Sequence, residues 1–178
     1  MDMTGEQRIA ASQQAVWAAL NDPDVLRQSI PGCESLEKLS DTEMTARVKL
    51  QIGPVRANFT GKVTLSDLDP PSGYRISGEG SGGAAGCAKG GAVVRLSPDG
   101  AGTLMRYEVK ADVGGKIAQL GGRLIDSTAK KLADEFFQRF TAIVGGAEIA
   151  PARSAAGEGW FARVKRWFAR WTRSPSTS

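Results

Sequence analysis

Few side chains in this sequence are suited to catalysis. Histidine is absent, which removes the usual base of Ser-His-Asp and Cys-His catalysis and the commonest ligand of zinc, copper and iron. The two cysteines, Cys33 and Cys87, are far apart and form no metal site by themselves. They are more typical of free thiols packed as small apolar side chains than of a redox pair. We therefore expect no catalytic residue and no metal site.

Carboxylates leave one catalytic alternative open. Asp or Glu can act as a general acid or base, and Glu79 and Glu108 are the candidates. An enzyme of the cyclase or hydrolase type would need one of them to face a cavity. Both fit a solvent-facing position equally well.

A glycine-rich run, GEGSGGAAGCAKGG, occupies residues 78–91. It superficially resembles a phosphate loop, but it lacks the Gly-Lys-Ser/Thr ending and stands between strand patterns instead of opening a helix. A hairpin whose strands carry small residues fits better. The missing side chains would leave room for a ligand beneath a covering element. Close packing of that element, or bulges, is the alternative.

The strongest pattern of aromatic and cationic residues lies in the last twenty residues. As a helix with about 100° per residue, this segment has one apolar and one cationic face. Such a helix is typical of a membrane interface; docking in a partner's groove, or on the protein's own body, stays open. The expected membrane-binding residues are Trp160, Phe161, Val164, Trp167, Phe168 and Trp171 on the apolar face, and Arg163, Lys165, Arg166 and Arg170 on the cationic face.

The charge is distributed unevenly along the chain. Of the net charge of +4, residues 159–178 hold +5, so residues 1–158 carry −1. Such a body is a poor nucleic-acid binder. The first ten residues do not read as a signal peptide, and no stretch approaches the roughly 20 apolar residues of a transmembrane helix. We expect a cytoplasmic protein, peripherally associated with the inner face of the cell membrane, that binds an anionic membrane surface and no nucleic acid.

Two short helices should follow the first strand, which is predicted over residues 3–10. Ser12 is the expected N-cap of a helix that ends near Leu20, and Asp22 caps a second helix with Pro23 at its first position. Alternating apolar and polar residues then predict strands. Their ranges are 35–39, 43–52, 55–68, 74–81, 85–96 and 103–113.

A helical pattern over residues 116–144 closes the folded part. Gly121-Gly122 is expected either to kink this helix or to mark its true start, and Gly145-Gly146 to stop it. Its neighbours Phe136 and Phe137 are about 100° apart, so only Phe136 is expected to face a cavity.

These elements predict an α+β fold. A curved antiparallel sheet of six to seven strands, with two short helices, would bury one face under the long C-terminal helix. We expect a ligand-binding domain over residues 1–144 and a flexible linker over 145–159. An amphipathic helix over 160–173 and a disordered end over 174–178 would follow.

Separated motifs resemble the G-subunit family of carbon monoxide dehydrogenase, whose fold is the helix grip of START-type and birch-pollen-allergen-like proteins. The resemblance spans residues 1–144. Its motifs are Val16-Trp17, Leu20-Asn21-Asp22-Pro23, Ile30-Pro31-Gly32-Cys33-Glu34, Ile52-Gly53-Pro54-Val55, Gly114-Gly115-Lys116-Ile117-Ala118-Gln119-Leu120-Gly121, Arg123-Leu124-Ile125 and Phe136-Phe137.

The resemblance implies a non-catalytic accessory protein. Its partner would be a molybdenum-containing carbon monoxide dehydrogenase or a related oxidoreductase, which it would link to the membrane and the respiratory chain. The ligand would be an apolar small molecule, menaquinone or ubiquinone, with no covalently bound cofactor. A recruitment adaptor with a filled core is the alternative, and the glycine-flanked segment 114–122 is either a gate or a plain connection. The candidate ligand-binding residues are Phe59, Gly80, Gly86, Ile117, Leu120, Leu124, Ile125, Thr128, Leu132 and Phe136.

Overall fold

The computed structural model describes residues 1–148. The predicted tail helix, the disordered end and most of the predicted linker lie outside these residues. The elements, in chain order, are β1 Asp2–Ile9, α1 Gln13–Leu20, α2 Pro23–Ser29, β2 Cys33–Lys38, β3 Glu43–Ile52, β4 Val55–Asp69, β5 Gly73–Ser81, the 3₁₀ helix η1 Gly83–Ala85, β6 Cys87–Asp99, β7 Gly102–Gly114, the 3₁₀ helix η2 Gly115–Leu120 and α3 Gly122–Glu148.

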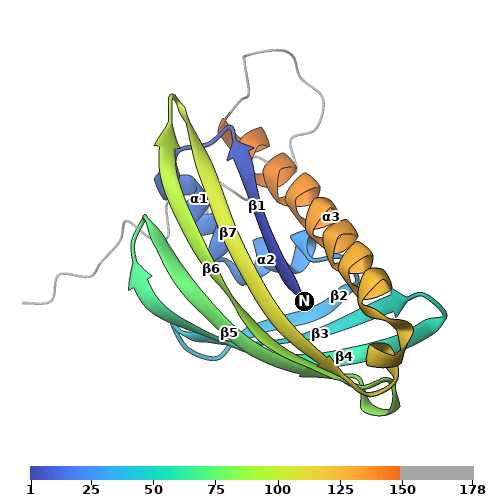
Figure 1. Ribbon diagram of the computed structural model, residues 1–178. Helices are drawn as coiled ribbons and strands as arrows, with labels where there is room; N and C mark the ends of the chain where they lie inside the picture. The colour runs from blue at the N-terminus through green and yellow to red at the C-terminus, as the bar shows by residue number, and fades with distance from the viewer. Residues whose placement is uncertain (149–178) are drawn as a thin grey trace, which may run out of the picture.

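The seven strands form one antiparallel sheet with the order β1-β7-β6-β5-β4-β3-β2. Every pair from β2 to β7 is a hairpin, while β1 joins β7, so β1 and β2 are the two edges. The sheet curves around α3, which crosses its concave side, and α1 and α2 lie beside α3 (Figure 1). The predicted α+β helix-grip architecture is confirmed.

The two short helices begin at the predicted caps. The Ser12 side chain accepts a hydrogen bond from the Ala15 amide at 3.2 Å. Asp22 accepts one from the Asp24 amide at 2.8 Å, with Pro23 at the first helical position. These bonds satisfy amides that have no partner within the first turn of a helix.

Gly121-Gly122 marks the start of the long helix. The residues before it form η2, and Gly121 adopts a positive φ of 90° between the two elements. A left-handed conformation of this kind favours glycine. The helical pattern from residue 116 therefore covers two elements instead of one kinked helix.

The prediction that Gly145-Gly146 ends the long helix is wrong. Helix α3 continues through this pair to Glu148, so the first residues of the predicted linker are helical. Val144 and Gly145 are buried, and an ideal Cβ on Gly145 would lie 3.8 Å from the Ala10 carbonyl oxygen. Because a buried backbone must keep its hydrogen bonds, tertiary packing outweighs the weak helix propensity of glycine here.

The hydrophobic core lies between the C-terminal half of α3, the sheet and α1. Phe140 and Val16 are completely buried, and Ile9 and Met105 are 2% exposed. Thr103 donates a hydrogen bond from its buried hydroxyl to the Ala11 carbonyl at 2.7 Å. The N-terminal half of α3 contributes no residue to this core cluster, so the space beneath that half lies outside the core.

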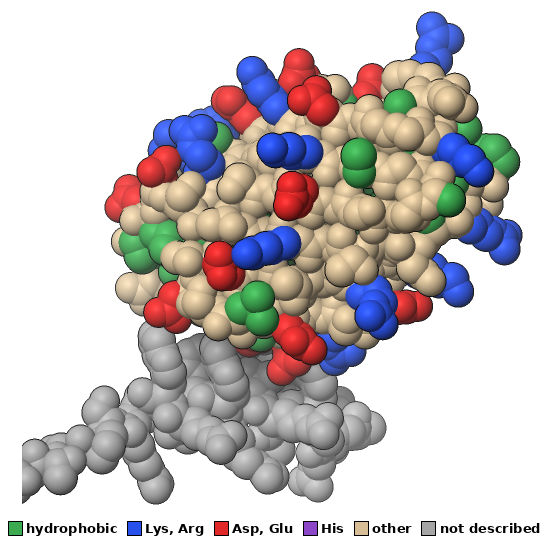
Figure 2. All heavy atoms as spheres, turned by 90° about the horizontal axis from the view of Figure 1, so that it is seen from below, with side chains coloured by type: hydrophobic (Ala, Val, Ile, Leu, Met, Phe, Trp, Pro, Cys, Tyr) green, Lys and Arg blue, Asp and Glu red, His purple; other side chains and the backbone are tan. Residues whose placement is uncertain are grey.

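The outer surface carries charges of both signs. Seen from below, acidic and basic side chains are interspersed and hydrophobic side chains are scattered (Figure 2). Exposed ion pairs join neighbouring strands, such as Lys62–Glu43 at 3.5 Å and Arg106–Glu6 at 3.4 Å. None of the helices within residues 1–148 has the length and hydropathy needed to cross a bilayer.

Candidate functional site

A row of small residues crosses the concave face of the sheet. Ala46, Gly61, Gly80, Ala88 and Val113 are register partners on the consecutive strands β3 to β7. Four of these five side chains are no larger than a methyl group, so they cannot fill the distance to a helix packed above the sheet. We call this set the small-residue row.

The space above the small-residue row is an apolar cavity of about 540 Å³, which we call the outer cavity. Its volume lies in the range of about 300–1,000 Å³ typical of small-molecule sites. Helix α3 covers it with Ile125, Thr128, Leu132 and Phe136, while Ile117 of η2 and Phe59 of β4 also line it. The Thr128 hydroxyl donates a hydrogen bond to the Leu124 carbonyl at 2.8 Å. The lining thus favours an apolar molecule.

A second cavity of about 320 Å³, the inner cavity, adjoins the first. The two share Ile30, Ala46, Val63, Ala133 and Phe136 as lining residues. The inner cavity extends toward α1 and α2, where its lining includes Leu20, Leu26, Tyr74, Val94 and Met105. Together the cavities provide an elongated apolar space along α3.

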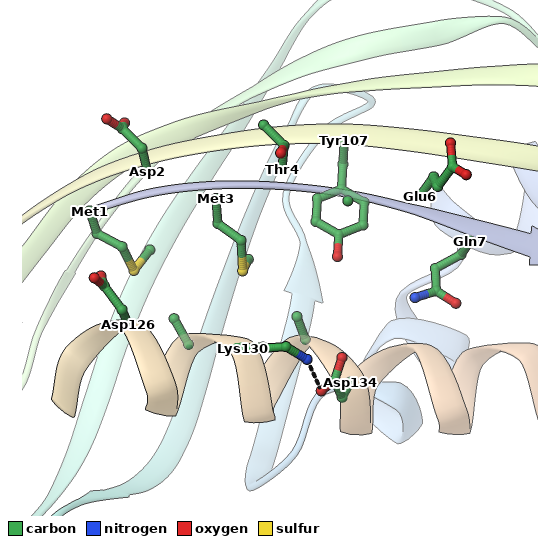
Figure 3. A pocket seen from close by; sticks show the side chains of 13 residues that line it. Met1, Asp2, Met3, Thr4, Glu6, Gln7, Tyr107, Asp126, Lys130 and Asp134 are labelled. Atoms are coloured by element: carbon green, nitrogen blue, oxygen red, sulfur yellow. Dashed lines mark hydrogen bonds and ion pairs between the residues drawn. The ribbon is translucent and has the colours of Figure 1, made fainter. Parts of the chain in front are cut away.

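A groove of about 390 Å³ lies between the edge strand β1 and α3 (Figure 3). Unlike the cavities it is lined by charged groups, among them Asp126 and the Lys130–Asp134 pair, whose Nζ and Oδ2 atoms are 2.8 Å apart. Met3, Tyr107 and Ala133 line both the groove and the inner cavity. These three side chains therefore form the wall between them.

Tyr107 is held in this wall from two sides. Its ring stacks on Phe137, with centroids 5.0 Å apart and an interplanar angle of 24°. A Cβ on Gly5, its partner on β1, would collide with the Tyr107 hydroxyl, so glycine is needed for the ring to cross the edge strand. The hydroxyl points toward α3 in the groove (Figure 3). Burial, reinforced by Asp134 and opposed by Lys130, raises the pKa of Tyr107.

Seven of the ten predicted ligand-binding residues line the outer cavity: Phe59, Gly80, Ile117, Ile125, Thr128, Leu132 and Phe136. The other three lie outside both cavities. Gly86 has a φ of 122° and packs against the Gly114 carbonyl. Leu124 packs against Gly53 of the β3–β4 turn, and Leu120 is half-buried at the end of η2. Helical spacing alone does not show which residues at the start of a helix extend beyond the sheet.

The expectation that only Phe136 faces a cavity is wrong. Phe136 lines both cavities, but Phe137 is only 9% exposed and also lines the inner cavity. The curved sheet surrounds more of the helix circumference than a flat sheet would, so two adjacent positions can both face inward. Their rings contact edge to face, with centroids 5.1 Å apart.

Several residues of the sheet complete the lining without having been predicted from the sequence. The small-residue row contributes Ala46, Gly61, Ala88 and Val113 besides Gly80, and β3 adds Val48, Leu50 and Ile52. Their signal was present in the alternation of the strands, which puts all of them on one face. Only the register between strands, however, brings the small ones into one row.

The candidate acid–base residues lie away from the cavities. Glu79 and Glu108 are exposed, and Glu79 stands between Lys62 and Lys89 in the sheet register. Burial raises the pKa of the half-buried Cys33 thiol, while Cys87 is exposed, and neither forms a disulfide. Within residues 1–148, no three His, Cys, Asp or Glu residues are placed to hold a metal ion.

Solved structures share this architecture. A conserved protein from Geobacillus kaustophilus is 28% identical, with a TM-score of 0.78 over 83% of this chain and 97% of its own. A START superfamily protein from Mycobacterium smegmatis is 13% identical, with a TM-score of 0.63 over 82% and 97%. The Zhui aromatase/cyclase from Streptomyces sp. R1128 is 12% identical, with a TM-score of 0.59 over 87% and 99%. At such identities the last two show the fold alone.

No curated protein matches this chain. The family described as the G subunit of carbon monoxide dehydrogenase (CoxG), in contrast, matches residues 5–145. This match covers nearly all of the described fold, including the sheet, η2 and α3. The chain belongs to the CoxG family of carbon monoxide dehydrogenase.

Proposed function

We propose that this protein is a non-catalytic accessory subunit that carries a respiratory quinone, menaquinone or ubiquinone, between an oxidoreductase and the cytoplasmic membrane. The oxidoreductase is a molybdenum-containing carbon monoxide dehydrogenase or a related enzyme. The protein receives the quinone at the inner face of the membrane and presents it to the enzyme, so that the electrons reach the respiratory chain.

The apolar space beneath α3 carries this proposal. The outer cavity alone encloses about 540 Å³, and apart from Thr128 its lining consists of apolar residues and glycines. Burial of a quinone's apolar surface there contributes about 25 cal/mol per Å² removed from water. A filled core, which the recruitment-adaptor alternative needs, would not leave this volume.

The arrangement of polar groups supports binding without catalysis. The Thr128 hydroxyl already donates to the backbone, and the carboxylates of Glu79 and Glu108 lie on exposed positions of the sheet. A general acid or base must reach its substrate within hydrogen-bond distance, which neither carboxylate does from there. Release of an unchanged ligand is the chemistry that such a cavity serves.

The sequence of the tail supports the membrane part of the proposal. The five cations of residues 159–178 each contribute up to about 1 kcal/mol near an anionic leaflet. The aromatic residues of the same segment favour the interface. The family's description as a dehydrogenase subunit supports the oxidoreductase as partner.

Organic extraction of the protein purified from its native membrane-containing cells, followed by mass spectrometry, tests the carriage of quinone. We expect a prenylated quinone in a stoichiometric amount. An extract without any apolar molecule, together with no binding of added quinone, would favour the recruitment adaptor and contradict the proposal.

A further inference from the structure

One buried hydroxyl of the inner cavity has no role in the fold. Tyr74, on β5, is 6% exposed and lines this cavity. The edge of one aromatic ring of the pair Tyr74–Trp17 meets the face of the other, with centroids 5.4 Å apart. The ring is therefore fixed by core packing, and burial raises the pKa of Tyr74, which keeps the phenol neutral.

The Tyr74 hydroxyl has no hydrogen-bond partner among residues 1–148. Every fully buried side-chain polar atom of these residues has one, so the Tyr74 oxygen belongs to the small part of the side chain that stays accessible. The inner cavity that Tyr74 lines provides that access. A hydroxyl removed from water without a partner costs about 1–3 kcal/mol, which a ligand atom at this position would offset.

The surroundings of Tyr74 make its hydroxyl distinctive. Tyr74, Val94 and Tyr107 are register partners on β5, β6 and β7, so two tyrosines flank one valine on the concave face. The Tyr107 hydroxyl, however, lies over Gly5 and points into the groove at the edge of the sheet (Figure 3). Tyr74 is thus the tyrosine whose hydroxyl stays with the apolar lining of the inner cavity.

We propose that the Tyr74 hydroxyl donates a hydrogen bond to an oxygen atom of the carried ligand. The polar ring of the ligand then occupies the inner cavity, while its apolar chain extends through the outer cavity toward η2. The ligand class is a molecule with a carbonyl oxygen at one end and a long apolar chain at the other. This inference rests on the proposed function and adds the orientation of the ligand.

Two matched tyrosine substitutions and two matched probes test the inference. The variants of the full-length protein are Tyr74→Phe and Tyr107→Phe, which remove one hydroxyl each from the same row of the sheet. The probes are a decyl-substituted naphthoquinone and decylnaphthalene, which differ in the two carbonyl oxygens. Dissociation constants are measured by quenching of intrinsic tryptophan fluorescence or by calorimetry.

We expect Tyr74→Phe to weaken naphthoquinone binding by about five- to tenfold, which is the effect of losing one neutral hydrogen bond. The affinity for decylnaphthalene should not change, because that probe offers no acceptor. Tyr107→Phe should leave the affinities for both probes unchanged. The ligand-free Tyr74→Phe protein should be at least as resistant to urea as the wild type, since it lacks an unpartnered hydroxyl.

Other outcomes separate the two proposals. If the wild type binds both probes and Tyr74→Phe changes neither affinity, or weakens both equally, the assigned hydrogen bond is wrong while carriage of an apolar ligand stands. If the wild type binds neither probe, the proposed carrier function itself fails. An effect of Tyr107→Phe equal to that of Tyr74→Phe would overturn the assignment to Tyr74.

Discussion

At the scale of single residues, the size of five side chains decides whether α3 covers a core or a cavity. The alternation of each strand is sufficient to place Gly61 or Gly80 on the concave face. It is not sufficient to place them side by side, because register depends on the lengths of the hairpin turns and on bulges such as that between Ser66 and Asp69. The cavity therefore became visible only with the register, although the glycine content of β5 and β6 had indicated it.

Filling the small-residue row should abolish ligand binding without harming the fold. An ideal Cβ on Gly80 would lie 3.7 Å from the Thr60 carbonyl oxygen and 3.9 Å from the Gly61 Cα, which are ordinary contacts. We expect Gly80→Val to weaken binding of the naphthoquinone probe at least about tenfold, because its methyl groups occupy the cavity. The free energy of unfolding should stay the same or rise by about 0.5–1 kcal/mol, since valine favours strands and restricts the unfolded chain.

Ser77→Val is the matched control for this substitution. Ser77 is exposed on the same strand, on the opposite face of the sheet. This variant should bind the probe like the wild type in a fluorescence titration, with a similar urea midpoint. Unchanged probe affinity in Gly80→Val would show that the ligand does not occupy the space above the small-residue row.

At the scale of elements, the strands were predictable and the ends of α3 were not. The range 43–52 agrees with β3, and the other strands differ by only a few residues, because alternation and the intervening turns are local signals. The start of α3 depends on Gly121, whose left-handed φ separates it from η2. Its end depends on packing against the segment after β1, which is distant in sequence.

Element η2 is suited to move as a unit. Gly115 and Gly121, at its ends, have φ values of 78° and 90°, which glycine adopts without strain. Between them Ile117 is 3% exposed and lines the outer cavity. This one side chain links η2 to the cavity, so the affinity of η2 for its closed position depends on it.

Shortening Ile117 should therefore speed ligand exchange. We expect Ile117→Ala to raise the dissociation rate of the naphthoquinone probe several-fold in stopped-flow displacement, because η2 loses its main apolar contact. The substitution should also lower the free energy of unfolding by about 2–4 kcal/mol. Gln119→Ala, at an exposed position of the same element, should change neither quantity. A dissociation rate unaffected by Ile117→Ala would identify η2 as a plain connection.

At the scale of the whole molecule, ligand and tail are attached at opposite ends of α3. Element η2 and the outer cavity lie at its N-terminal end, and the chain continues toward residue 149 from its C-terminal end (Figure 1). The 27 residues of α3 separate these ends by about 40 Å at 1.5 Å per residue. The charges are divided in the same way, since residues 159–178 hold +5 and the remainder −1. Membrane attachment and ligand binding should thus be separable by mutation.

Deletion of residues 159–178 tests this separation. With the five cations and the aromatic residues removed, the protein should no longer float with vesicles that contain phosphatidylglycerol, whereas the full chain should do so at low salt and detach as salt screens its charges. Because the deletion begins beyond the end of α3 that is remote from η2, the affinity for the naphthoquinone probe in detergent-free solution should not change. Unchanged flotation would contradict the membrane assignment. A loss of probe affinity or of urea resistance would instead indicate that the tail docks on the protein's own body, and neutral vesicles serve as the control for non-specific adsorption.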